Sequence, residues 1–192
     1  MIKDNDIAIP MQGGGDVVAE GVSFDGATDY LSRSSDLVGN VDSKTFTFSA
    51  WVYVPEDYAQ GGSDYFLSIG YNNHYIRRTT YNKVNYKFSD SANSAVLSGA
   101  SDIGISLSTF TNILISYDAN SSNFSLYLND TAVSYSNTSQ LNGVIDFTKD
   151  MLHIMRDDNS QYSKGRLSHL FLDYTYRDLS IEANRRLFLV PS

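Results

Sequence analysis

The chain has 192 residues, of which 42% are hydrophobic, and this supplies enough apolar material for one large core without a second domain. Its net charge of −8 excludes nucleic acid as an expected ligand, because an acidic surface repels phosphate backbones. The absence of cysteine excludes disulfides and thiol chemistry.

Residues 1–16 are predicted to form a flexible arm in front of a single domain that spans residues 17–192. Gly13, Gly14 and Gly15 are consecutive and provide a hinge. The opening residues contain no apolar run long enough for a signal peptide or a membrane span. We therefore expect synthesis in a cytosol and no membrane insertion.

The clearest predicted strand covers Thr45–Val54 and is ended by Pro55. Alternate residues point to opposite faces of a strand. The first set is apolar and should face a second sheet; it comprises Phe46, Phe48, Ala50, Val52 and Val54. The second set mixes hydroxyls with Trp51 and Tyr53, as expected for a half-exposed surface.

Period-two patterns continue along the chain. Further strands are predicted around Tyr65–Tyr71, Val84–Phe88, Phe110–Tyr117, Asn123–Asn129, Met151–Met155 and Arg166–Tyr176. In the third of these segments, Ile113 and Ile115 share a face, and residues 118–122 have a turn-forming composition that predicts a hairpin to the next strand. Asn129 and Asp130 predict a tight turn, because both tolerate positive φ.

A single short helix is predicted over Ile181–Leu187. Ser180 is suited to cap it, Glu182 suits its positive end, and Arg185 and Arg186 suit its negative end. Many short strands and one helix predict an all-β, two-sheet antiparallel jelly-roll sandwich with a short C-terminal helix.

Four segments resemble a known family in the right order. They are Val22–Leu31 (VSFDGATDYL), Phe46–Val52 (FTFSAWV), Ser125–Asp130 (SLYLND) and Gly165–Leu187. They are similar to the FDGxxDY, FTxSAWV, LxLYVDG and closing GxIDEVRIYNRALS segments of laminin-G-like, concanavalin A-like lectin/glucanase jelly rolls. The ending Ala183–Phe188 also resembles jelly-roll proteins encoded by bacteriophages. The resemblance implies a sandwich that binds ligands or assembles with partners.

The resemblance also implies a possible calcium ion at the rim of the sandwich, since many relatives hold one there. Asp25 and Asp157 are the candidate ligands in this sequence. Calcium takes about six to eight oxygen ligands. The family's closing acidic pair is replaced here by Ser168 and His169, so part of the usual set is missing. The alternative interpretation is that Asp25 belongs to a turn and Asp157 to a solvated loop.

Catalysis is not expected. Relatives that hydrolyse glycosides carry an acidic Glu-x-Asp-x-x-Glu pattern, and the retaining reaction needs two carboxyl groups about 5 Å apart. The three glutamates here, Glu20, Glu56 and Glu182, are scattered. The three histidines, His74, His153 and His169, lack metal-ligand spacing.

Aromatic side chains that stack on sugar rings, with polar neighbours that bind hydroxyls, point to a possible saccharide site. The candidates are Trp51, Tyr53, Tyr71, Asn73 and Tyr75. The alternative is that these aromatics are ordinary residues of β-sheets, where tyrosine is common.

Two functional hypotheses follow. The first is a non-catalytic bacteriophage virion protein, either a capsid decoration protein or a tail or fibre component, that forms a homo-oligomer and contacts other virion or capsid proteins. Its location would be the virion, after synthesis in the host cytoplasm. The alternative is a carbohydrate-binding, lectin-like adhesion module that recognises surface glycans. The two hypotheses overlap, because a virion protein that binds host glycans satisfies both.

Overall fold

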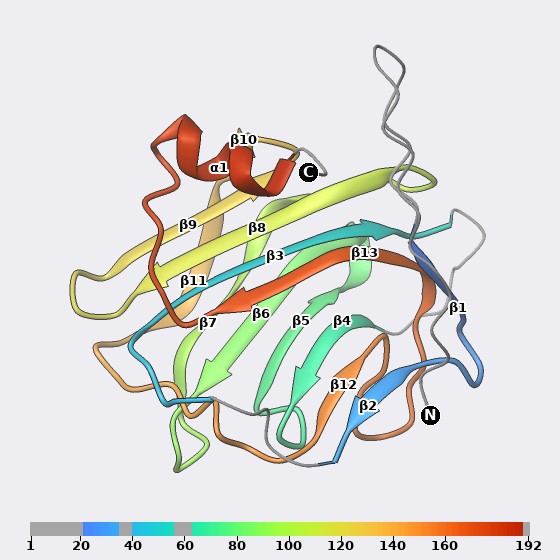
Figure 1. Ribbon diagram of the computed structural model, residues 1–192, viewed down its shortest axis with the longest axis horizontal. Helices are drawn as coiled ribbons and strands as arrows, with labels where there is room; N and C mark the ends of the chain where they lie inside the picture. Colours follow the sequence, from blue (N-terminus) through green and yellow to red (C-terminus); the bar gives the residue numbers. More distant parts are fainter. Residues whose placement is uncertain (1–20, 35–39, 56–62, 190–192) are drawn as a thin grey trace.

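The protein is a sandwich of two antiparallel sheets in the computed structural model, which describes residues 21–34, 40–55 and 63–189 (Figure 1). The predicted arm, Glu20 and Glu56 lie outside these residues. One sheet has the order β1 (Val22–Asp25), β13 (Lys164–Asp173), β3 (Thr45–Tyr53), β8 (Phe110–Asp118), β9 (Asn123–Leu128) and β10 (Thr131–Ala132). The other has the order β11 (Tyr135–Gln140), β7 (Ala95–Gly104), β6 (Lys83–Ser89), β5 (His74–Arg78), β4 (Asp64–Ile69), β12 (Leu152–Ile154) and β2 (Leu31–Arg33). A short 3-10 turn, η1 (Thr80–Asn82), joins β5 to β6. The predicted all-β jelly-roll architecture is confirmed.

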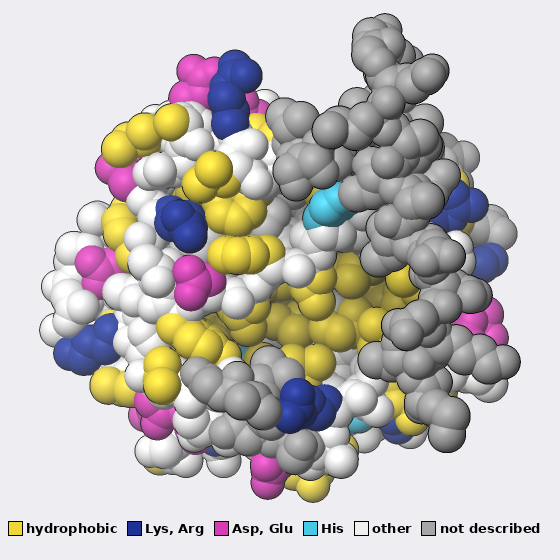
Figure 2. Space-filling view, in the orientation of Figure 1, with side chains coloured by type: hydrophobic (Ala, Val, Ile, Leu, Met, Phe, Trp, Pro, Cys, Tyr) yellow, Lys and Arg dark blue, Asp and Glu magenta, His cyan; other side chains and the backbone are white. Residues whose placement is uncertain are grey.

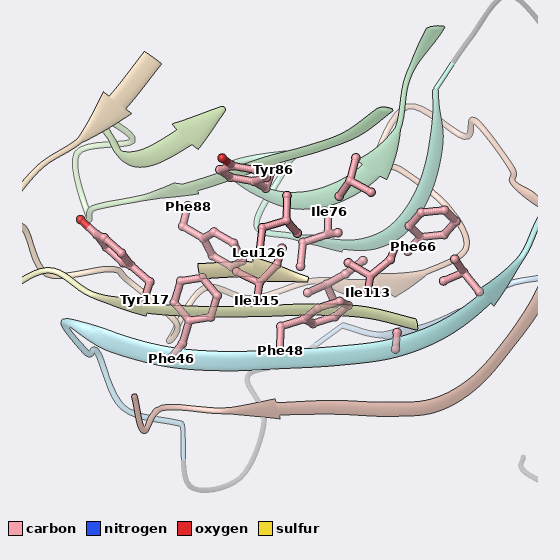
Figure 3. Packing of buried hydrophobic residues seen from close by; sticks show 14 of the residues in the cluster. Phe46, Phe48, Phe66, Ile76, Tyr86, Phe88, Ile113, Ile115, Tyr117 and Leu126 are labelled. Atoms are coloured by element: carbon pink, nitrogen blue, oxygen red, sulfur yellow. The ribbon is translucent and has the colours of Figure 1, made fainter. Parts of the chain in front are cut away.

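The core lies between the two sheets and follows the predicted alternation of β3. The five apolar residues on one face of the segment 45–54 are all buried, whereas Trp51 and Tyr53 on the other face are partly exposed. Phe46 meets Phe88 of β6 with ring centroids 4.2 Å apart (Figure 3). Dense contact between the inner faces of the sheets is the main source of stability in such a fold.

Strand β4 departs from the predicted pattern. The sequence predicts that Tyr65, Leu67 and Ile69 share one face, but the pairing of β4 with β5 shifts register between Tyr65 and Leu67. Phe66, Leu67 and Ile69 all belong to the core, and Tyr65 does not. A β-bulge inserts one extra residue and so resets the alternation. Tyr65 therefore lies on the outer face of the seven-stranded sheet.

The predicted turns and the helix are present. Strands β8 and β9 pair as a hairpin, and Asn129 and Asp130 after β9 have φ of 49° and 65°. The helix α1 runs over Glu182–Leu189, close to the predicted range. The hydroxyl of Ser180 donates to Asp178 Oδ1 at 2.7 Å, so Asp178 organises the turn that leads into the helix.

Helix α1 lies over the outer face of the six-stranded sheet (Figure 1). Arg185 of the helix forms an ion pair with Asp130, and its guanidinium lies 4.9 Å from the ring centroid of Tyr127 on β9. The two sheets bend in the same direction in Figure 3, so the outer face of the seven-stranded sheet is the concave side of the sandwich. None of the described helices has the length and apolar character needed to cross a membrane.

Candidate functional site

Trp51 lies under the C-terminal helix. Its side chain points from β3 to the outer face of the six-stranded sheet, and its indole N–H donates to the carbonyl oxygen of Phe188 at 3.1 Å. The ring is only partly exposed. The indole N–H is therefore already engaged in holding the helix, and the same group is not free to bind a sugar hydroxyl.

Tyr53 lies on the same face, at the end of β3. Phe110 contacts its ring with centroids 5.5 Å apart, and the guanidinium of Arg166 lies 5.3 Å from its centroid. Figure 2 shows the molecule from the side of α1: the middle of this view is a hollow lined by apolar side chains, and charged side chains are scattered around it. The visible face is thus mainly apolar at its centre.

Tyr75 lies on the opposite side of the molecule, on the concave face of the seven-stranded sheet. It pairs with Ser68 of β4 and Lys87 of β6. Because the outer faces of the two sheets of a sandwich point away from each other, Tyr75 and Trp51 do not form one site.

Tyr75 belongs to a group of four side chains on three neighbouring strands, which we call the aromatic–arginine cluster. Its members are Tyr65, Tyr75, Arg77 and Asn85. The Arg77 guanidinium lies 4.4 Å from the ring centroid of Tyr75 and 5.3 Å from that of Tyr65. Its Nη1 donates to the Tyr65 hydroxyl at 2.6 Å and its Nε to Asn85 Oδ1 at 3.1 Å. The guanidinium is therefore held in one position by two rings and two neutral acceptors.

The Tyr65 hydroxyl keeps its proton in this arrangement. Burial raises the pKa of the Tyr65 hydroxyl above its usual value, and Arg77 opposes that rise only in part. The hydroxyl is neutral at physiological pH and accepts the hydrogen bond from Arg77. The positive charge of Arg77 consequently has no compensating phenolate beside it.

A buried polar group borders the cluster on the side of β12. His153 faces Ser68 across the sheet, and its Nε2 lies 3.1 Å from Asp158 Oδ1 without the alignment of a hydrogen bond. Burial lowers the pKa of His153, while Asp158 opposes the shift. Ser68 Oγ donates to Asn72 Oδ1 at 2.8 Å. Ser68 Oγ also lies 3.4 Å from Asp158 Oδ2, so the border of the cluster includes a carboxylate, and Ser68 and His153 are themselves buried.

Tyr71 and Asn73 lie in the turn between β4 and β5. Tyr71 is the more exposed, with 72% of its surface accessible, and has φ of 57°. Asn73 Nδ2 donates to the Gly70 carbonyl oxygen at 2.5 Å within the same turn. Asn73 therefore stabilises the turn, whereas Tyr71 is exposed to solvent.

The predicted metal ligand Asp25 stabilises the turn that follows β1. Its Oδ1 accepts hydrogen bonds from the backbone N–H groups of Ala27, Thr28 and Asp29, at 2.8 to 3.0 Å. These bonds hold the pKa of Asp25 well below its usual range, with the Thr28 N–H as the largest cause. The arrangement matches the alternative interpretation of Asp25 as a turn residue.

Asp157 plays a similar part in the loop after β12. Its Oδ1 accepts from the backbone N–H of Asn159 at 2.9 Å and from that of Gln161 at 2.7 Å. Within the described residues, no three Asp, Glu or His side chains lie together in a group that could hold a metal ion. The local geometry thus gives no assembled calcium site, and calcium binding stays a prediction.

The sequence profile of the concanavalin A-like lectin/glucanases superfamily matches residues 25–172, which is most of the chain. The chain belongs to this superfamily. The profile match bears out the resemblance to this superfamily. The search of curated protein sequences gave no significant match.

Two crystal structures illustrate the superfamily fold. A native heptameric SAP-like pentraxin from Limulus polyphemus has a TM-score of 0.58 at 13% identity, over 82% of this chain and 76% of the pentraxin. A protein from Bacteroides ovatus, named for a suggested carbohydrate-binding role, has a TM-score of 0.58 at 10% identity, over 83% of this chain and 46% of its own. At these identities the likeness concerns the fold alone.

The sequence pattern points to Tyr75 but not to its partners Arg77, Asn85 and Tyr65. A signal for two of them existed, because Arg77 is two residues from Tyr75 and Asn85 alternates with the core residues of β6. No local sequence pattern indicates which strands lie next to each other in the sheet, however. The bulge in β4 separates Tyr65 from Leu67 and Ile69, with which the sequence alternation groups it.

Proposed function

We propose that the protein is a non-catalytic carbohydrate-binding module whose binding site is the aromatic–arginine cluster on the concave sheet. The observation that carries the proposal is the placement of a partly exposed Tyr75 ring beside a guanidinium fixed by Tyr65 and Asn85. Sugars are recognised by an aromatic face together with a few directed polar groups, and this cluster supplies both.

The name of the Bacteroides ovatus structure supports the same class of function. One of the two similar structures is named as a pentraxin and the other for carbohydrate binding. The likeness is one of fold, so the ligand assignment rests on the residues of this chain. The pentraxin is described as heptameric, which is consistent with the prediction that this chain forms a homo-oligomer.

The absence of catalysis is part of the proposal. Of the carboxylates near the cluster, Asp157 accepts two backbone N–H groups of its own loop, and Asp158 lies beside His153. Glu182 lies on α1, over the other sheet, and pairs with Arg186. A hydrolysis assay on laminarin-type β-glucans tests this part, and release of reducing ends would contradict it.

The test of binding is a glycan array followed by titration calorimetry on the sugar class that binds. We expect Tyr75→Ala to weaken binding at least tenfold, because a stacking interaction and the support of Arg77 are both lost. The control is Tyr53→Ala, which removes the same type of side chain from the opposite face. Circular dichroism verifies that both variants are folded.

The affinities of the variants show which face of the protein binds the sugar. Equal affinity of the native protein and Tyr75→Ala would exclude the cluster, and a loss with Trp51→Ala alone would transfer the site to the helix-covered face. Repeating the titration with calcium and with EDTA tests the calcium prediction. An affinity that does not change with EDTA would show that sugar binding needs no calcium.

The bacteriophage virion role stays a prediction. It rests on the resemblance of the C-terminal segment to phage-encoded jelly rolls, and on the predicted N-terminal arm, which lies outside the described residues. A deletion of residues 1–15 is expected to weaken self-association without unfolding the domain. Light scattering coupled to size-exclusion chromatography measures this, and an unchanged oligomer would refute the arm's role.

A further inference from the structure

Two basic side chains on the concave face have no acidic partner. In the described part of the chain, the hydrogen bonds of Arg77 go to Tyr65 and Asn85, both neutral, and Lys87 forms neither an ion pair nor a hydrogen bond. Several other basic residues form ion pairs with carboxylates, as Arg78 does with Asp64 and Arg185 with Asp130. In a protein with a net charge of −8, Arg77 and Lys87 are thus two neighbouring cations without an ion-pair partner.

The two charges are placed to act together. Arg77 pairs with Asn85 and Tyr75 pairs with Lys87 across β5 and β6, so Arg77 and Lys87 are diagonal neighbours on one face. Diagonal neighbours in an antiparallel pair are about 7–8 Å apart, within the reach of long side chains. An anionic group above Tyr75 would therefore be within reach of both cations.

The guanidinium also has donors to spare. Arg77 uses Nε and Nη1 for the two neutral acceptors, and Nη2 makes no hydrogen bond to a described residue. A guanidinium donates through five N–H groups in a planar fork that matches the geometry of a carboxylate or a sulfate. Because two rings and two acceptors already hold it in place, little side-chain entropy remains to be lost on binding.

From these observations we propose that the site selects acidic saccharides, with a sugar carboxylate or sulfate held between Arg77 and Lys87 and the sugar ring against Tyr75. The inference rests on the proposed carbohydrate function and names its ligand class. The carboxylate or sulfate of the sugar acts as the acidic partner that Arg77 and Lys87 lack within the protein. Opposite charges in a partly desolvated site give charge-assisted hydrogen bonds, which are about twice as strong as neutral ones.

The experiment is a calorimetric titration with tetragalacturonic acid, its fully methyl-esterified form and a sulfated galactan tetrasaccharide. The ester keeps the sugar ring and removes only the charge. We expect the acid to bind at least tenfold more tightly than the ester, and raising the NaCl concentration from about 0.05 M to about 0.5 M to reduce the difference, since salt screens exposed charges. The relative affinities of the carboxylated and sulfated sugars identify the preferred anion.

Charge-removing variants test whether the preference for the acid arises from Arg77 and Lys87 or from the charge of the whole protein. Lys87→Gln, outside the aromatic–arginine cluster, should weaken binding of the acid about tenfold or more while binding of the ester changes little. Arg77→Gln removes part of the cluster itself, so it should weaken binding of both sugars, and binding of the acid by the larger factor. Arg186→Gln is the control, because it removes the same charge from the exposed surface of α1. Thermal unfolding verifies that the three variants are folded.

Each result decides the proposal. Equal affinity for the acid and the ester would overturn the inference and leave the carbohydrate function in place. Binding of the acid that survives both Arg77→Gln and Lys87→Gln would overturn it as well. If polyglutamate binds with the same dependence on Arg77 and no saccharide binds, the ligand is an acidic peptide, and the carbohydrate function fails with the inference.

Discussion

The indole N–H of Trp51 donates to the carbonyl oxygen of Phe188 at 3.1 Å, and this bond ties the middle of β3 to the end of α1. The protein contains a single tryptophan. Its fluorescence therefore reports on one place only, the contact between the six-stranded sheet and the C-terminal helix. This relationship gives a direct way to follow docking of the helix.

Arg185→Ala is expected to loosen the helix. The substitution removes the ion pair with Asp130 and the contact of the guanidinium with Tyr127, at a cost of about 1 kcal/mol of unfolding free energy. The emission maximum of Trp51 should move to longer wavelength as the indole becomes more exposed. Arg186→Ala, on the exposed side of the same helix, is the control. An identical spectrum for Arg185→Ala and the native protein would show that Arg185 does not hold the helix.

His74 makes stability depend on pH. The ring is buried: its Nδ1 accepts the backbone N–H of Ser89 at 2.9 Å, and its Nε2 lies 2.7 Å from the Asp146 carbonyl oxygen. Burial lowers the pKa of His74 to about 4, with a smaller contribution from Lys149, while Asp146 opposes the shift. The neutral ring with its proton on Nε2 is the form that fits these two partners.

The sign of the effect follows from linkage. The unfolded chain, with a histidine pKa of about 6.5, binds more protons than the folded one in this range. The stabilisation is complete above pH 6.5 and is lost as the pH falls toward 4, by about 3 kcal/mol. Chemical denaturation at several pH values measures it. His74→Gln should remove the contribution of His74 and leave that of the buried His153, and the exposed His169→Gln should leave the dependence intact. Equal slopes in both variants would contradict the assignment.

Phe46 is a central residue of the core. Its ring is fully buried and meets Phe88 at 4.2 Å and Phe147 at 5.9 Å between centroids. Phe46→Ala should lower the unfolding free energy by about 3–5 kcal/mol, because transfer energy is lost and a cavity remains. Tyr71→Ala, at an exposed position, should change it by no more than about 0.5 kcal/mol. Urea denaturation of the two variants provides the comparison.

Gly165 has no room for a side chain. Its φ is 150°, and a Cβ built there would lie 2.2 Å from the carbonyl oxygen of Tyr53 on the neighbouring strand β3. Gly165→Ala should therefore separate β13 from β3 locally and cost about 3 kcal/mol. A melting temperature equal to that of the native protein would show that this backbone contact is not tight. Ser139→Ala, in the edge strand β11, is the control: it removes one hydrogen bond to the Ala95 carbonyl oxygen and should cost only about 1 kcal/mol.

Most of the framework follows from local pattern. The side chains of β3, β8 and β9 alternate along the chain, and alternation alone assigns residues such as Phe46, Ile113 and Leu126 to the core. The turn at Asn129 and Asp130 and the helix that begins at Glu182 likewise depend on a few adjacent residues. These features were predicted correctly because their causes lie within a few positions of each other.

The candidate site depends on relationships that are not local. Strand order brings Tyr65 of β4 and Asn85 of β6 to the two sides of Arg77, and a bulge in β4 turns Tyr65 outward. Trp51 looks equivalent to Tyr75 in the sequence, but α1 covers the face of Trp51. The sequence by itself determined which residues form strands and which face the core, since side-chain direction follows the backbone. Only the tertiary structure decided which outer face carries the cluster, because pairing of distant strands and docking of the helix involve residues far apart in the chain.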